Sequence, residues 1–159
     1  MSQSDKFIRQ VTTPFFFRLF MLKELPMLFL AGITVKELSA AHAVTSLKYS
    51  YLTKNPFRSI YFACLAMAAE LSSGAIAMML VQQSGVKISM LVTGMKVDYT
   101  KKAVGKILFT CNEGKKIEEA IASTKQNGEG VTITVNSIGK DEAGDIVAAF
   151  VFTWSFRRK

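Results

Sequence analysis

The longest apolar segment of the chain runs from Ser59 to Val81 and contains one charged residue, Glu70. A helix that is apolar on all faces is normally buried on all faces. The pattern therefore predicts one long core helix over this segment. Ser59 is the expected N-cap, and Asn55 followed by Pro56 is an equally acceptable cap pair one turn earlier.

Strand-like segments flank this helix on both sides. Two precede it, at residues 33–38 and 43–51. Four follow it. They lie at residues 88–99, at residues 104–111, from Val131 up to the turn at Gly139–Gly144, and at residues 145–156. The last segment is apolar on both faces, which predicts a central strand or one that a partner subunit covers.

The remaining segments look helical. Residues 6–30 are rich in Phe, Leu and Met, but Arg18 and Lys23 interrupt them and Pro26 divides them, so we expect two short amphipathic helices and no membrane span. Residues 117–126 predict another short helix. We expect residues 1–30 to form an N-terminal helical extension and residues 31–159 to form one domain, because 159 residues suffice for one real core.

Runs of strands around one long helix indicate an α+β fold with an antiparallel sheet wrapped around that helix. Hydropathy alone would allow residues 60–81 to cross a membrane. Glu70 in the middle of the segment and the strands at its ends argue against this, so we expect no transmembrane insertion.

The chain carries a formal net charge of +8. This charge suits a polyanionic partner such as a membrane surface, a nucleic acid or a phosphate-bearing cofactor, although it also suits solubility alone. No nucleic-acid partner is expected, because neither an aromatic stacking motif nor a basic recognition helix is present. Cys64 and Cys111 have no metal-site spacing and predict two buried, reduced thiols in a cytoplasmic protein, and no signal peptide is apparent at the start of the sequence.

The order of elements resembles the hotdog fold, and the residues at the helix entry strengthen the resemblance. Hotdog thioesterases of the phenylacetyl-CoA type (PaaI-like) carry an Asn, a short loop, His-Gly-Gly, and an acid nine residues after that His. Asn55 stands in the Asn place, Tyr61-Phe62-Ala63 in the place of His-Gly-Gly, and Glu70 in the place of the acid. His-Gly-Gly itself is absent, and Arg58 stands where Gly is common. The pattern is most similar to an uncharacterised branch of the superfamily with an N-terminal helical extension.

This resemblance implies hydrolysis of an acyl-CoA or acyl-carrier thioester by a homodimer, or by a tetramer of two such dimers, with sites shared between subunits. It implies no metal and no cofactor other than the coenzyme A of the substrate. The loss of His-Gly-Gly supports an alternative, a non-catalytic protein that binds acyl chains or lipids. A third reading is a small membrane protein, which the apolar helix and the basic C-terminal residues would suit.

Thioester hydrolysis needs a base or nucleophile and donors for the developing oxyanion. Glu70 fits the first role, since burial would raise its pKa toward neutrality; a buried Glu satisfied by a backbone amide or a partner subunit is the structural alternative. The amides of Tyr61, Phe62 and Ala63 are the expected donors if Ser59 caps the helix, although every helix start has such amides.

Three further groups are candidates. Asn55 would orient a water or the thioester carbonyl, or simply cap the helix. Ser73, one turn beyond Glu70, would hold its carboxylate or a water, or only permit close packing. Lys101 and Lys102 belong to a basic cluster with Lys106, Lys115 and Lys116 that would meet coenzyme A phosphates or an acidic carrier protein, or be a solvated face. His42, the only histidine, is expected to be structural.

Overall fold

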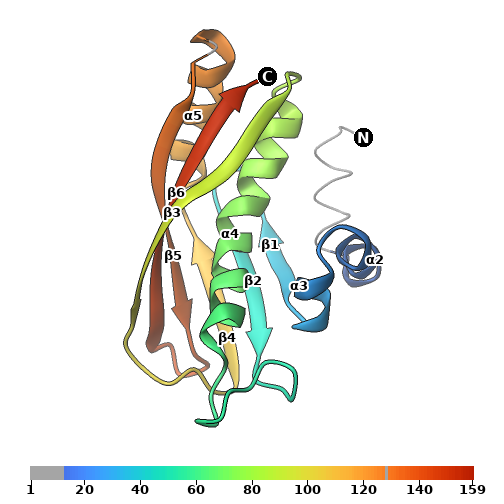
Figure 1. Cartoon of the computed structure of the whole chain (residues 1–159), viewed down its shortest axis with the longest axis vertical. Helices are drawn as coiled ribbons and strands as arrows, with labels where there is room; N and C mark the ends of the chain where they lie inside the picture. The colour runs from blue at the N-terminus through green and yellow to red at the C-terminus, as the bar shows by residue number, and fades with distance from the viewer. Residues whose placement is uncertain (1–12, 128) are drawn as a thin grey trace.

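A six-stranded antiparallel sheet curves around one long helix in the computed structural model, which describes residues 13–127 and 129–159 (Figure 1). The elements are α2 (Pro14–Glu24), α3 (Pro26–Leu30), β1 (Thr34–Leu38), β2 (Ala43–Lys48), α4 (Phe62–Gln83), β3 (Ile88–Tyr99), β4 (Lys106–Cys111), α5 (Gly114–Asn127), β5 (Val131–Lys140) and β6 (Ile146–Arg158). This order of two strands, a long helix and four strands confirms the α+β prediction.

The strand order across the sheet is β1-β2-β4-β5-β6-β3, and every neighbouring pair is antiparallel. β6 lies between β5 and β3, which confirms that the strand with two apolar faces is interior. β1 and β3 are the two edges of the sheet. The twelve-residue β3 is the longer edge, and one side of its backbone has no neighbouring strand among the described residues.

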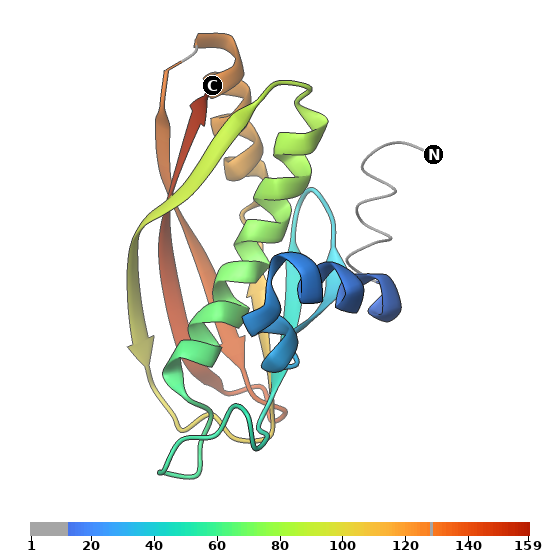
Figure 2. The same cartoon turned by 45° about the vertical axis from the view of Figure 1, so that its right-hand side comes forward.

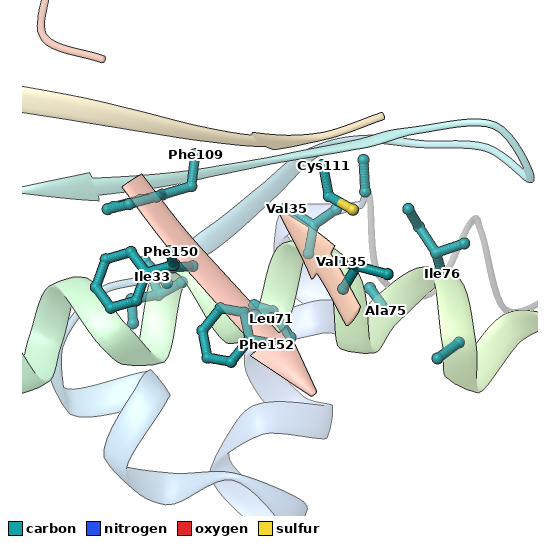
Figure 3. Close-up of a cluster of buried hydrophobic side chains, with 14 of the residues drawn as sticks. Ile33, Val35, Leu71, Ala75, Ile76, Phe109, Cys111, Val135, Phe150 and Phe152 are labelled. Carbon is teal, nitrogen blue, oxygen red and sulfur yellow. The ribbon is translucent and has the colours of Figure 1, made fainter. Parts of the chain in front are cut away.

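The core lies between α4 and the concave face of the sheet. Leu71, Ala75 and Ile76 of α4 lie among side chains of the sheet that include Phe109 and Phe152 (Figure 3). α4 is long and apolar enough to cross a membrane, but 72% of its most apolar window is buried within the protein. The rest of the protein therefore covers most of the surface that a lipid bilayer would otherwise contact.

The long helix begins two residues later than a Ser59 N-cap predicts. α4 begins at Phe62, and its N-cap is Tyr61, which has extended backbone angles and no capping side chain. Ser59 does not cap, because its Oγ donates a 3.2 Å hydrogen bond to Oδ1 of Asn55. The backbone amide of Ile60 donates to the carbonyl of Ala103 at 2.8 Å, which holds this segment extended up to the helix.

The ends of several strands also differ from the prediction, by one to three residues. β2 ends at Lys48 because Thr53 Oγ1 accepts a 2.8 Å hydrogen bond from the amide of Ser50 and closes a turn. β5 continues through Gly139, which was expected to open a turn. A Cβ at Gly139 would overlap the ring of Phe109, so this glycine allows close packing inside the sheet.

The N-terminal helices pack beside α4 and β1 (Figure 2). The expected division near Pro26 is confirmed, since α3 begins at that residue. Phe17 and Met21 of α2 are each only 2% exposed and join the core. The predicted helical residues 6–12 lie outside the described residues. Both cysteines are free and buried, as expected.

Candidate active site

Glu70 lies half-buried on α4 and lines a cavity of about 110 Å³. The other lining residues come from α2, the α2–α3 junction, β1, α4 and β3, and all of them are apolar: Phe17, Phe20, Leu25, Val35, Leu71, Gly74, Ala75, Met78 and Met90. No described residue pairs with the Glu70 carboxylate or donates a hydrogen bond to it. Burial without such a partner raises the pKa of Glu70 to about 7. The carboxyl can therefore both lose and regain a proton near neutral pH.

Ser73 does not hold the Glu70 carboxylate. Its Oγ donates to the backbone carbonyl of Glu70 at 3.1 Å and accepts a 3.0 Å hydrogen bond from Nε1 of Trp154. Both contacts are structural, because they satisfy the hydroxyl and the indole inside the core. Gly74 is a residue that the sequence reasoning missed: it lies one turn beyond Glu70 and leaves space that the carboxylate oxygen occupies.

Asn55 organises the loop that leads into α4. Its Oδ1 accepts hydrogen bonds from the amides of Phe57 (2.9 Å) and Ser59 (3.2 Å), and its Nδ2 donates to Ser59 Oγ at 3.0 Å. Asn55 therefore stabilises the loop that precedes α4 and does not cap the helix. Arg58, at the loop's tip, has a φ of 59°, a left-handed conformation in which Gly is the usual residue.

The helix entry offers two backbone donors instead of the three expected. The amide of Tyr61 is not available, because it donates to the carbonyl of Thr53 at 2.7 Å. The amides of Phe62 and Ala63 have no acceptor among the described residues, as expected for the first turn of a helix. Phe62 lines a second pocket of about 540 Å³ together with Tyr61, whereas Ala63 does not line it.

The predicted basic cluster is divided between two places. Lys101 and Lys102 line the helix-entry pocket, whereas Lys115 and Lys116 lie in the first turn of α5, beyond the other end of β4. The intervening strand β4 separates them, because six extended residues span about 20 Å.

Within the entry pocket the two lysines differ. Nζ of Lys101 lies 2.7 Å from a carboxylate oxygen of both Asp141 and Asp145, and these hydrogen bonds raise the pKa of Lys101 to about 12. Lys102 is exposed and forms no salt bridge with a described residue. Lys102 is therefore the better placed of the two to meet an anionic ligand.

One chain does not bring the carboxyl and the amide donors together. Eight residues of helix separate Phe62 from Glu70, which corresponds to about 12 Å along α4. The two pockets share no lining residue. Glu70 lies near the exposed edge of the sheet, because Met90 of β3 lines its cavity.

The other polar candidates take no part in either pocket. Nδ1 of His42 lies 3.1 Å from Ser39 Oγ, and its Nε2 lies 3.1 Å from Glu37 Oε2. These local contacts at the β1–β2 turn fit the expected structural role. In the part of the chain that the structure describes, no group of three or more His, Cys, Asp or Glu side chains is arranged to hold a metal ion.

Comparison with known proteins identifies the architecture. A family model described as a domain of unknown function (DUF4442) matches residues 14–156. No curated protein sequence matches the chain.

Several solved structures share the fold at low identity. A protein of unknown function from Pseudomonas aeruginosa, named a probable thioesterase, superposes with a TM-score of 0.77 at 17% identity, covering 94% of this chain and 99% of that chain. A protein of unknown function from Chlorobaculum tepidum gives 0.75 at 12%, covering 94% and 99%. A thioesterase from Haemophilus influenzae gives 0.66 at 10%, covering 88% of each chain. These likenesses confirm the hotdog fold.

Proposed function

The chain belongs to the DUF4442 family of domains of unknown function, and from that premise we propose that it hydrolyses acyl thioesters of coenzyme A or of an acyl carrier. The observation that carries the proposal is the Glu70 carboxyl, which lies in an apolar cavity without a polar partner among the described residues. A half-buried carboxyl in apolar surroundings without a polar partner is costly for a fold to keep, and such groups concentrate at functional sites. Structural neighbours named as thioesterases support the same reaction class.

In the proposed reaction the Glu70 carboxylate takes a proton from water while the water oxygen attacks the thioester carbonyl carbon. The amides of Phe62 and Ala63 stabilise the negative charge that develops on the carbonyl oxygen. The tetrahedral intermediate then collapses, the carbon–sulfur bond breaks, and the proton passes from Glu70 to the thiolate. The products are a carboxylic acid and a free thiol.

Glu70 has a second possible role as the nucleophile. Its carboxylate would attack the carbonyl carbon, release the thiolate and form a mixed anhydride. Water would then hydrolyse that anhydride and return the carboxylate. Transfer of oxygen from ¹⁸O-labelled water into the Glu70 side chain during turnover is expected only for this route.

A homodimer completes the proposed site. Glu70 and the entry amides lie about 12 Å apart along one helix, so a second subunit must supply one of them. The β3 edge is the proposed contact, because its backbone can pair with a second copy and Leu91 and Met95 on it are 63% and 47% exposed. Pairing there would bring the second subunit next to the Glu70 cavity. We place the protein in the cytoplasm, where its two free thiols would stay reduced.

A non-catalytic acyl-binding protein is the second candidate. His-Gly-Gly is absent, and the Tyr61 amide already has an acceptor. An apolar cavity with a single polar group would also suit binding without turnover.

The test measures free-thiol release by the purified protein from acyl-CoAs of different chain lengths. Wild-type turnover and a loss of at least about 100-fold in kcat for both Glu70→Ala and Glu70→Gln are expected. Glu119→Gln, an exposed acid on α5, is the matched control and is expected to keep the wild-type rate. Absence of turnover with every substrate, or an undiminished rate in both variants, would reject the proposal and favour the binding protein.

A further inference from the structure

The N-terminal helix forms part of the lining of the Glu70 cavity. Phe17 and Phe20 of α2 line it, together with Leu25 at the α2–α3 junction, and α2 lies beside α4 (Figure 2). Phe17 is 2% exposed and part of the core, whereas Phe20 is half-buried. α2 thus forms one side of the cavity. Truncation of Phe20 should cost less core packing than truncation of Phe17.

The size of the cavity limits what it can hold. Its volume is about 110 Å³, and a dry apolar cavity of about 150 Å³ is known to accommodate benzene. By that comparison, the cavity has space for about four carbon atoms. Its lining is apolar apart from the Glu70 carboxyl, so the matching ligand is a short hydrocarbon chain with a reactive or polar group at one end.

We propose that this cavity takes the acyl group of a short-chain thioester, of about four carbons, and that Phe20 of α2 sets the upper limit of chain length. The assignment of the ligand as an acyl group rests on the proposed thioesterase function. The limit itself rests on the cavity's volume and on the position of α2. Longer chains would have to displace the aromatic side chains of α2.

Binding of non-hydrolysable ligands tests this inference without requiring turnover. The probes are S-alkyl coenzyme A thioethers from ethyl to dodecyl. Trp154, the only tryptophan, is a suitable reporter, because its Cζ2 lies 3.5 Å from where a Cβ of the cavity-lining Gly74 would be. Calorimetry provides an independent Kd.

For the wild type, Kd is expected to fall about fourfold per carbon up to butyl and to fall no further from hexyl onward. Phe20→Ala is expected to extend the fall to octyl, which makes its octyl Kd at least about tenfold lower than that of the wild type. Phe20→Leu, a smaller truncation, should shift the limit in the same direction. Phe16→Ala is the matched control, since Phe16 lies on the same helix, is 46% exposed and does not line the cavity.

A wild-type Kd that falls evenly to dodecyl, or equal effects of the Phe20 and Phe16 variants, would overturn the chain-length inference. Hydrolysis of the corresponding acyl-CoAs is measured in parallel. This measurement distinguishes failure of the chain-length inference from failure of the proposed function. Turnover without a chain-length limit would reject only the cavity inference. A binding limit near four carbons without any turnover would reject only the catalytic function.

Discussion

A Cβ at Gly74 would lie 2.8 Å from Oε1 of Glu70. That separation is shorter than a van der Waals contact, so the carboxylate occupies space that a larger residue at position 74 would fill. The two residues lie one turn apart on α4, where side chains four positions apart share a face. Gly74 therefore positions the carboxyl along the helix surface.

Gly74→Ala tests this relationship through stability. In a Glu70→Ala background the substitution is expected to raise the free energy of unfolding by about 1 kcal/mol, the usual advantage of Ala over Gly in a helix interior. In the wild-type background the gain should be smaller, because the carboxyl must move from its position. Urea denaturation of the four proteins in this cycle measures the difference.

Two readouts decide the outcome of this cycle. If Gly74 positions Glu70, Gly74→Ala should also lower kcat while the protein remains folded. Equal stability gains in both backgrounds would show that the carboxyl does not need this space. The neighbouring Trp154 does not oppose the added methyl group, because its 3.5 Å separation is an ordinary contact.

Glu70 also makes stability depend on pH. Burial raises its pKa from 4.5 to about 7 in the folded protein, so between these values the folded state holds a proton that the unfolded state has lost. Stability from the neutral carboxyl is therefore fully present below about pH 4.5 and is lost as pH rises to about 7. Glu70→Gln should have little effect on the free energy of unfolding at pH 4.5, and should raise it by up to about 3 kcal/mol at pH 8.

The measurement is the difference in free energy of unfolding between the two proteins at each pH, because titration of the other groups cancels in that difference. A difference that stays constant between pH 4.5 and pH 8 would contradict the raised pKa. The same pKa predicts that kcat/KM rises about tenfold per pH unit below pH 7 and levels off above it, since the carboxylate is the active form in both proposed routes.

The hydrophobic pattern was sufficient to predict the long helix and the interior position of β6. Both depend on apolar side chains at every face of an element. Such a pattern can be recognised without knowing which other elements pack against it. The start of α4 was not predictable in the same way. Ser59 is a good N-cap by residue type, but Asn55 engages it through side-chain contacts that hold the preceding loop extended.

Of the candidate site, only the part that one residue identifies by itself could be predicted from the sequence. Glu70 stands out because it is the sole charge in an apolar segment. Ser73 Oγ accepts from Trp154, which is 81 positions away in sequence, and donates to the backbone carbonyl of Glu70, so spacing along one helix indicated the right residue but the wrong oxygen. The space left by Gly74 and the Tyr61–Thr53 hydrogen bond depend on the fold, and no local signal indicates them.

Ser73→Ala distinguishes the structural role of this serine from a catalytic one. The substitution leaves Nε1 of Trp154 without its acceptor in the core, which should lower the free energy of unfolding by about 1–3 kcal/mol. The pH dependence of kcat/KM should not change, because Ser73 Oγ contacts the backbone carbonyl of Glu70 and not its carboxylate. In a Trp154→Phe background, where the donor is absent, the loss of stability should be smaller. A shifted pH profile would instead place Ser73 beside the reacting groups.

The two lysines of the helix-entry pocket give a matched pair for testing recognition of phosphate. Lys101 is held by Asp141 and Asp145, so its charge is already neutralised, whereas Lys102 has no such partner among the described residues. Lys102→Met should raise KM for an acyl-CoA about two- to fivefold, the range of an exposed ion pair, and this effect should weaken at high salt. Lys101→Met should change KM less.

The control substrate for this pair is the matching acyl N-acetylcysteamine thioester, which has the same acyl group and no phosphate. Lys102→Met should leave its KM unchanged, because only the phosphates of coenzyme A would contact the lysine. An equal rise in KM for both substrates would show that Lys102 shapes the pocket and does not bind phosphate. An effect confined to Lys101→Met would mean that the ion pair with Asp141 and Asp145 opens when coenzyme A binds.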